Sequence, residues 1–163
     1  MFDDHLLMLA RLTLDEAQQR RLKIATAESC TGGLIAGLLT EIPGSSATVE
    51  RGFIVYSNRA KEEMLNVPGD LIADAGAVSE PVVRAMAEGA LELSRANLAV
   101  AVTGVAGPGG GTPLKPVGLV HLAVARENKP IFHQAMRFGD IGRDKVRRET
   151  IVTALEMLRK MMA

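Results

Sequence analysis

The spacing of apolar and polar positions along the chain switches several times between a helical and a strand-like period. Leucines and alanines at helical spacing predict an amphipathic helix over residues 3–20, and the apolar run over residues 24–27 fits a short buried strand. A second helix is expected over residues 34–42, where a proline–glycine pair ends it. The β-branched and aromatic run over residues 53–56 predicts a second strand.

The second half of the chain continues with two helices, three strands and a last helix. Asn58 and Ser79 are expected to be the N-caps of the two helices, because their side-chain oxygens can accept from free backbone N–H groups. A short polar connection joins the last two strands, which favours an antiparallel hairpin. The three strands and the last helix are predicted over residues 98–102, 117–125, 131–138 and 143–162.

This order of elements indicates an α/β fold. Early alternation of helices and strands, followed by a late hairpin, predicts a three-layer α/β/α sandwich around a mixed, mostly parallel sheet of about five strands. The chain has 163 residues, close to the roughly 150 residues of a typical domain. Residues 1–163 are therefore expected to form a single domain.

Composition and charge narrow the classes of function. The 19 basic and 19 acidic side chains balance, and aromatic residues make up only 3% of the chain, which argues against a surface for nucleic acid. The sequence has no apolar run long enough for a membrane span, and its acidic start argues against a secretory signal. One cysteine and three scattered histidines give no metal-binding pattern. We therefore expect a cytoplasmic protein without nucleic-acid, membrane or metal partners, and the Met and Leu side chains of its end helices are compatible with a homo-oligomer.

The first segment with candidate chemistry is the junction between the first strand and the second helix. Ser29 lies there, where backbone N–H groups at the start of the helix could stabilise an oxyanion or hold a phosphate. Gly32 and Gly33 would let a ligand approach the backbone closely. The alternative is that Ser29 or Thr31 only caps the helix. Cys30 is a rival nucleophile, although a small buried thiol is the more common case.

A lysine in the next helix is a candidate base. Lys61 falls just past the predicted strand over residues 53–56, so it could face the same end of the sheet as Ser29. A lysine becomes a base only when burial or nearby positive charge lowers its pKa. Tyr56 could relay the proton or hold the lysine in place. The alternative, which the residues taken alone favour, is a solvated lysine and a half-buried tyrosine.

A glycine-rich loop follows the third strand, which is the usual position of a ligand loop in an open α/β sheet. The loop lacks both the ending of a Walker A motif and the Gly-x-Gly-x-x-Gly pattern with its following helix. A flexible surface loop is the alternative, but five glycines between positions 104 and 111 are more than a turn requires. The candidate binding residues in this segment are Thr103, Gly104, Gly107, Gly109 and Gly110.

Four basic residues within positions 143–148 open the last helix. The helix dipole disfavours cations there, whereas a bound anion would be attracted both by the arginines and by the free N–H groups. A small ligand bearing a phosphate, held by Arg143 or Arg147, is one hypothesis. A solvated charged face is the other.

Taken together, these segments resemble the CinA carboxy-terminal domain family, also called the nicotinamide-nucleotide amidohydrolase or NMN deamidase family. The resemblance extends from about residue 18 to the C-terminus and rests on six motifs in a fixed order. They are AESCTGG (27–33), PGSS (43–46), YSN (56–58) with Lys61, GAVS (76–79), TGVAGPGGGT (103–112) and KPVG (115–118). Against the family pattern we expect two departures: these residues include no counterpart of the additional amino-terminal domain of longer members, and two residues are inserted near positions 141–142.

The resemblance implies hydrolysis of the carboxamide of nicotinamide mononucleotide (NMN) to nicotinate mononucleotide and ammonia, in pyridine-nucleotide recycling and without a cofactor. It also implies that Ser29 is the nucleophile, Lys61 its base and Tyr56 an assisting hydroxyl. Backbone N–H groups near residues 30–33, or in the loop over residues 104–111, are candidates for an oxyanion hole. Two alternatives are an amidase for another small phosphorylated carboxamide and a catalytically silent nucleotide-binding or regulatory module.

Overall fold

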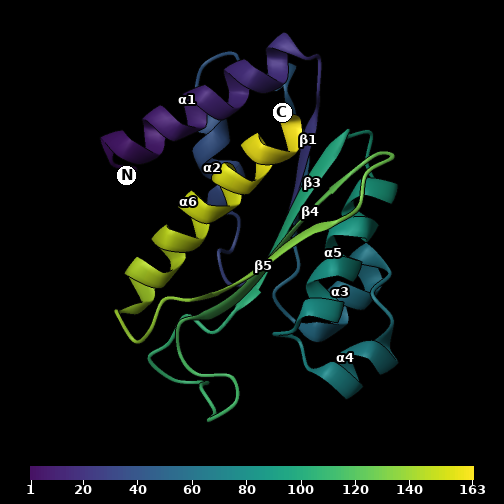
Figure 1. Cartoon of the computed structure of the whole chain (residues 1–163), viewed down its shortest axis with the longest axis vertical. Helices are drawn as coiled ribbons and strands as arrows, with labels where there is room; N and C mark the ends of the chain where they lie inside the picture. Colours follow the sequence, from purple (N-terminus) through teal and green to yellow (C-terminus); the bar gives the residue numbers. More distant parts are fainter.

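A five-stranded sheet lies between two layers of helices in the computed structural model, which describes residues 1–163 (Figure 1). The strands are arranged in the order β2-β1-β3-β4-β5. The helices and strands are α1 (Asp4–Gln19), β1 (Ile24–Glu28), α2 (Leu34–Glu41), the 3-10 helix η1 (Ser45–Ala47), β2 (Val49–Ile54), α3 (Asn58–Leu65), α4 (Gly69–Ala75), α5 (Glu80–Glu92), β3 (Leu98–Gly104), β4 (Leu119–Arg126), β5 (Phe132–Arg137) and α6 (Arg143–Met162).

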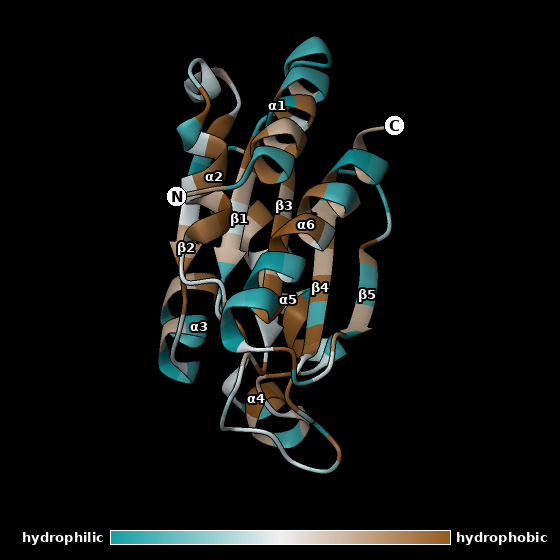
Figure 2. Ribbon diagram, turned by 90° about the vertical axis from the view of Figure 1, so that its left-hand side faces the viewer, coloured by the Kyte–Doolittle hydropathy of each residue, from teal (hydrophilic) through white to brown (hydrophobic).

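The sheet is mixed. Strand β1 pairs in parallel with both β2 and β3, whereas β4 runs antiparallel to its neighbours β3 and β5. Four strands therefore point the same way and β4 alone is reversed, as Figure 2 shows from the side of α1 and α6. The predicted mixed, mostly parallel sheet and its late hairpin are confirmed.

The two helical layers give the molecule two separate apolar clusters. Helices α1, α2 and α6 cover one face of the sheet, and α3, α4 and α5 cover the other (Figure 1). A cluster of 26 buried residues lies between the first three helices and the sheet, and a cluster of 16 lies on the other face. Successive residues of β3 alternate between them, because strand side chains point to opposite faces: Leu98 and Val100 join the first cluster, and Ala99 and Ala101 the second. The predicted three-layer sandwich is confirmed, and double coverage explains why the inner strands are almost entirely apolar.

Local boundaries differ from the sequence prediction around the second strand. Strand β2 (Val49–Ile54) begins four residues before the predicted run over residues 53–56. It lies at the edge of the sheet, where exposed positions can carry polar side chains. Such positions lack the apolar pattern by which a strand is recognised in a sequence. Ser57, not Asn58, is the N-cap of α3, and the short helix α4 (Gly69–Ala75) was not predicted.

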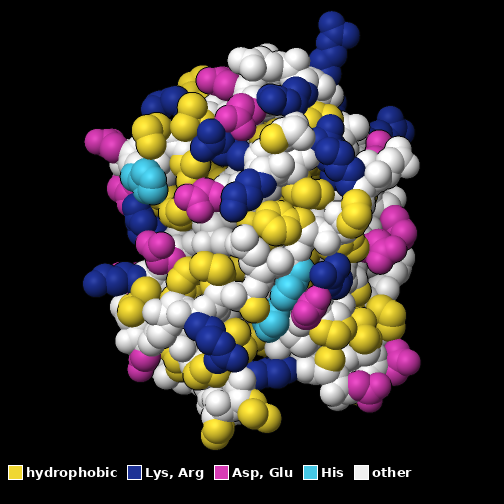
Figure 3. Space-filling model, in the orientation of Figure 1, with side chains coloured by type: hydrophobic (Ala, Val, Ile, Leu, Met, Phe, Trp, Pro, Cys, Tyr) yellow, Lys and Arg dark blue, Asp and Glu magenta, His cyan; other side chains and the backbone are white.

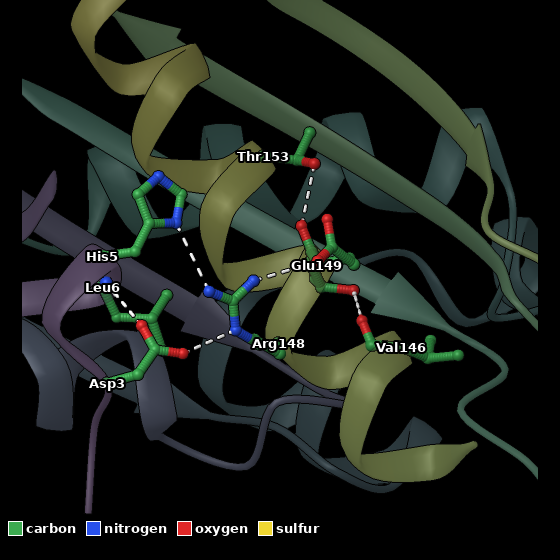
Figure 4. A network of polar contacts seen from close by, with 8 residues as sticks. Asp3, His5, Leu6, Val146, Arg148, Glu149 and Thr153 are labelled. Carbon is green, nitrogen blue, oxygen red and sulfur yellow. Dashed lines mark hydrogen bonds and ion pairs between the residues drawn. The ribbon is translucent and has the colours of Figure 1, made fainter. Parts of the chain in front are cut away.

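An ionic contact joins the start of α1 to the start of α6 (Figure 4). The guanidinium of Arg148 donates to the carboxylate of Asp3 at 2.8 Å and to Glu149 at 3.0 Å. Asp3 is also the N-cap of α1, since its other oxygen accepts from the backbone N–H of Leu6. The hydrogen bond from Arg148 is the main cause that lowers the pKa of Asp3.

The face of the molecule drawn in Figure 3 carries charges of both signs. Lys and Arg side chains are interspersed there with Asp and Glu side chains instead of forming one basic region. None of the helices combines the length and the apolar character needed to cross a membrane. No group of three or more His, Cys, Asp or Glu side chains is arranged to hold a metal ion.

Candidate active site

A cavity of about 200 Å³ opens beyond the carboxyl ends of β1 and β3. In open α/β sheets, ligands bind at this edge because the loops that follow parallel strands converge there. The cavity collects residues from the loop after β1, the start of α3, the segment before α5, the glycine-rich loop and the start of α6. The lining residues are Ser29, Cys30, Tyr56, Asn58, Lys61, Ala77, Val78, Thr103, Gly104, Ala106 and Arg143.

The structure brings Ser29 and Lys61 together. Ser29 directly follows β1, and its backbone N–H donates to the carbonyl of Val102 in β3 at 3.2 Å, which fixes its position. Lys61 lies in the first turns of α3, which follows the neighbouring parallel strand β2. Its Nζ is 3.2 Å from Oγ of Ser29. The two side chains predicted as nucleophile and base are thus within direct hydrogen-bonding distance.

The environment of Lys61 disfavours the charged form of its amine. The side chain is only 1% exposed, and burial lowers its pKa. Besides Ser29, its Nζ contacts only the backbone carbonyls of Val55 at 3.1 Å and Tyr56 at 3.4 Å, and it forms no salt bridge. When the amine is neutral it has two N–H groups and one lone pair, so two bonds to the carbonyls would leave the lone pair for the hydroxyl of Ser29.

Cys30 lines the same cavity but is poorly suited to act as a nucleophile. Its side chain is buried, and burial raises the pKa of the thiol to about 12. Because the thiolate is the reactive form, this shift disfavours Cys30 as a nucleophile. Ser29 is the better candidate of the two.

Glu28 determines how the helix after Ser29 begins, a role that the sequence did not reveal. Gly33, the residue before α2, gives no side-chain cap. The buried carboxylate of Glu28 instead accepts from the N–H of Ile35 at 2.8 Å, the N–H of Ala36 at 3.0 Å and the hydroxyl of Thr31 at 2.6 Å. Neither Ser29 nor Thr31 therefore caps α2. An acidic residue at the end of an apolar strand, just before a helix, is the signal that could have indicated this contact.

We expect Glu28→Gln to destabilise the fold by about 1–3 kcal/mol, because a neutral amide has one acceptor oxygen for N–H groups that now share two. Urea unfolding measures the change. Glu92→Gln, at the exposed end of α5, is the matched control and should stay within about 0.5 kcal/mol of wild type. Equal stability of the two variants would contradict this account of the helix start.

Tyr56 and Arg143 meet at the cavity. The Tyr56 hydroxyl accepts from Nη2 of Arg143 at 3.0 Å, and Nη1 of the same arginine donates to the carbonyl of Gly107 at 2.8 Å. The Tyr56 side chain is 62% exposed, and its hydroxyl has no hydrogen bond with Ser29 or Lys61; only its backbone carbonyl contacts the lysine. Arg143 therefore links the segment after β2 to the glycine-rich loop across the cavity.

The second candidate arginine is placed differently. Arg147 does not line the cavity. Its Nε donates to the carbonyl of Cys30 at 3.1 Å and its Nη2 to the carbonyl of Thr31 at 3.4 Å. The two arginines predicted as alternatives for one phosphate thus have separate contacts: Arg143 lines the cavity, and Arg147 binds carbonyls of the loop that carries Ser29.

Of the glycine-rich segment, only its start reaches the cavity. Thr103 and Gly104, the last two residues of β3, line it together with Ala106, and the hydroxyl of Thr103 donates to the carbonyl of Ala77 at 3.0 Å. Gly109 and Gly110 border a different groove of about 720 Å³, which shares no residue with the cavity. The remaining predicted binding residues, Thr31, Gly32, Gly33 and Gly107, do not line the cavity either.

The relationship to known proteins follows from a family model. The model described as the CinA C-terminal domain matches residues 7–162. The chain belongs to this family. A CinA-like protein of Akkermansia muciniphila is 64% identical over 107 residues, which are 66% of this chain and 26% of that protein. A CinA-like protein of Anaeromyxobacter sp. (strain K) is 49% identical over 151 residues, 93% of this chain and 36% of that protein. The chain thus spans about a quarter to a third of the curated relatives it matches.

Solved structures of the CinA superfamily have the same fold. The crystal structure of competence/damage inducible protein CihA from Agrobacterium tumefaciens superimposes with a TM-score of 0.98 at 53% identity, covering 100% of this chain and 99% of that one. The resemblance predicted from the six motifs is therefore confirmed at the level of family and fold.

Four cavity residues of this CinA-family chain were missed as site residues. They are Asn58, Ala77, Val78 and Ala106. Asn58 was interpreted as a helix cap, but Ser57 has that role and Asn58 lines the cavity instead. All four fall within the motifs that carried the family resemblance, so those motifs were the available signal.

Proposed function

We propose that this protein is a cytoplasmic serine–lysine amidohydrolase that converts NMN to nicotinate mononucleotide and ammonia. The observation that carries the proposal is the buried amine of Lys61, 3.2 Å from Oγ of Ser29 and without an acidic partner. Burial of an amine costs free energy. A protein that only binds a ligand would gain nothing from a buried amine beside a serine, whereas a serine hydrolase gains a base. Membership of the CinA C-terminal domain family supports the same conclusion.

The reaction proceeds in two stages. Neutral Lys61 removes the proton from Oγ of Ser29 as that oxygen attacks the carboxamide carbon, forming a tetrahedral intermediate. The proton then passes from Lys61 to the amide nitrogen, the C–N bond breaks, and ammonia leaves an acyl-enzyme ester on Ser29. In the second stage Lys61 removes a proton from water, which attacks the ester carbon. The protonated lysine returns that proton to Oγ, and the product is released with a free carboxylate.

An unpaired backbone N–H beside Ser29 supports an oxyanion hole in the loop after β1. The N–H of Ser29 itself is occupied by the carbonyl of Val102. The N–H of Cys30, a residue that lines the cavity, donates to no other residue of the protein. Free donors next to a nucleophile can stabilise the negative oxygen that develops on the substrate carbonyl.

The cavity size and Arg143 support a small phosphorylated carboxamide. A volume of about 200 Å³ is below the roughly 300–1,000 Å³ of sites for larger ligands. The ring and its carboxamide would occupy the cavity, and the ribose phosphate would extend beyond it. Arg143 lines the cavity and has N–H groups besides those that contact Tyr56 and Gly107, so it is the residue we assign to the phosphate.

We expect Arg143→Ala to raise the KM for NMN about tenfold, the effect of one lost charge-assisted contact. Hydrolysis of nicotinamide riboside, which lacks the phosphate, should change much less. Steady-state kinetics with both substrates tests this, with Arg11→Ala on the exposed side of α1 as the control. If Arg143→Ala raised the KM for NMN and for nicotinamide riboside by the same factor, Arg143 would not be the phosphate ligand.

Tyr56→Phe should leave kcat within about threefold of wild type and raise the KM for NMN modestly. The deleted hydroxyl contacts Arg143 and not the reacting serine and lysine, so its loss costs one ordinary hydrogen bond. The same kinetic assay decides the matter: a fall in kcat of about 100-fold would instead establish the tyrosine hydroxyl as a participant in proton transfer.

A further inference from the structure

Arg147 contacts the loop that carries Ser29 without lining the substrate cavity. Residues 29–33 form this loop, the nucleophile loop. The guanidinium reaches from the first turns of α6 and donates to two consecutive carbonyls, those of Cys30 and Thr31. The carbonyl of Cys30 accepts from no other group in the protein, whereas that of Thr31 also accepts from the N–H of Leu34.

The nucleophile loop needs such a contact because its own backbone constrains it weakly. It belongs to neither a strand nor a helix, and Gly32 and Gly33 both have left-handed backbone angles, at φ +58° and +100°. Glycine in these conformations gives the chain the turn from β1 into α2, but it also leaves alternative conformations accessible. The peptide between Cys30 and Thr31 has only the bond from Arg147 to define its orientation.

The orientation of that peptide constrains Cys30, the residue next to Ser29 at the cavity. In a planar trans peptide, the carbonyl of Cys30 and the N–H of Thr31 point in opposite directions. Thr31 is buried, whereas Cys30 lines the cavity and its N–H has no acceptor in another residue. A guanidinium that holds the carbonyl of Cys30 therefore fixes the peptide that follows this residue. The neighbouring N–H of Cys30 is oriented in the same way by the bond from Gly32 to the carbonyl of Ser29.

We propose that Arg147 is a positioning residue for the nucleophile loop, which orients the backbone donors beside Ser29, and not a ligand of the substrate phosphate. The inference rests on the proposed function in taking Ser29 as the nucleophile. An arginine suits the task because its planar fork can contact two carbonyls at once and its charge does not titrate. A lysine in its place would offer a single point of contact.

The test compares Arg147→Ala and Arg147→Lys with Arg148→Ala as the matched control. Arg148 is the next arginine of α6, but it turns to Asp3 and Glu149 and has no contact with the nucleophile loop (Figure 4). For Arg147→Ala we expect kcat to fall about 10- to 100-fold, somewhat less than the loss of an entire oxyanion donor. NMN and nicotinamide riboside should lose the same factor. Arg147→Lys should fall between wild type and alanine, and Arg148→Ala should keep the wild-type kcat.

Two readouts separate positioning from general damage to the fold. Added guanidinium ion should restore part of the kcat of Arg147→Ala, because it can occupy the vacated position between the two carbonyls, and it should not accelerate wild type. A higher KM for NMN with unchanged kcat would overturn the inference and return Arg147 to phosphate binding. So would a loss of kcat that neither guanidinium nor lysine relieves.

A measurement without substrate distinguishes failure of this inference from failure of the proposed function. A fluorophosphonate probe phosphonylates an activated serine, expelling fluoride as Oγ bonds to phosphorus, and the developing P–O charge needs the same donors. If wild type is labelled at Ser29 but does not hydrolyse NMN, the proposed substrate is wrong. In that case, slower labelling of Arg147→Ala than of wild type would still support the positioning role. Equal labelling rates in wild type and Arg147→Ala would overturn the positioning role alone. A wild type that neither hydrolyses NMN nor reacts at Ser29 would overturn both.

Discussion

Replacement of Ser29 by alanine should abolish the release of ammonia from NMN. The variant lacks the only hydroxyl that contacts the buried amine of Lys61, so no acyl-enzyme can form. We expect kcat to fall at least about 10⁴-fold, since removal of the nucleophile from serine hydrolases costs on the order of 10⁶. An assay of ammonia release, combined with chromatographic detection of nicotinate mononucleotide, measures the loss.

The fold should tolerate this change, which makes the result interpretable. Ser29 is held through its backbone N–H, which alanine retains, and the deleted oxygen leaves little empty volume. Ser94→Ala, after the end of α5, serves as the control for a serine outside the cavity and should keep full activity. Hydrolysis by Ser29→Ala at the wild-type rate would retain the activity but eliminate the serine mechanism. Absence of hydrolysis by wild type would refute the proposed substrate.

Replacement of Lys61 by methionine should lower kcat about 10³- to 10⁴-fold, because general-base catalysis at this position is lost while the volume of the side chain is kept. The unfolding free energy should stay within about 2 kcal/mol of wild type. Methionine loses the hydrogen bonds to the carbonyls of Val55 and Tyr56, but it also avoids the free-energy cost of burying an amine. Kinetics and urea unfolding of the same preparation test both statements.

Lys61 also predicts how activity and stability depend on pH. Burial lowers the pKa of its amine, and the neutral form is the base, so kcat/KM should rise with pH through that lowered pKa and then level off. Between the lowered native pKa and the ordinary pKa of the unfolded chain, the unfolded state binds the additional proton. Stability should therefore rise with pH across this interval, and Lys61→Met should remove that contribution.

An exposed lysine far from the cavity provides the control for Lys61. Lys160→Met, near the C-terminal end of α6, makes the same chemical change at a position that is exposed to solvent. It should retain both the wild-type kcat and the wild-type pH profile. If Lys61→Met showed the same pH dependence of kcat/KM as wild type, the titrating base would be another group.

The larger features of the fold were predictable because they follow from hydrophobic pattern alone. The inner strands β1 and β3 are nearly continuous apolar runs, as a sheet covered on both faces requires. The edge strand β2 was misplaced, because partial exposure lets Glu50, Arg51 and Gly52 occupy positions that carry no apolar signal. Helix α4 was missed for a similar reason: only Ile72 among its seven residues is buried.

The candidate site was predicted in part. The serine and lysine came from motifs of the sequence, and their proximity follows from parallel pairing of β1 with β2, which places the segments after both strands at one edge of the sheet. The separate contacts of the two arginines were not predictable. Arg143 and Arg147 are one helical turn apart and carry the same charge, but one contacts Tyr56 and Gly107 and the other contacts the nucleophile loop.

The sequence by itself determined the family, the layered α/β architecture and the residues that could react, because apolar periodicity and ordered motifs are local properties of the chain. Only the tertiary structure decided the state of those residues. Lys61 becomes a candidate base because segments distant in sequence bury its side chain. Glu28 caps α2 because the end of β1 meets the start of that helix. Desolvation and hydrogen bonding depend on which distant segments surround a side chain, and that is fixed by packing of the whole sheet and its two helical layers.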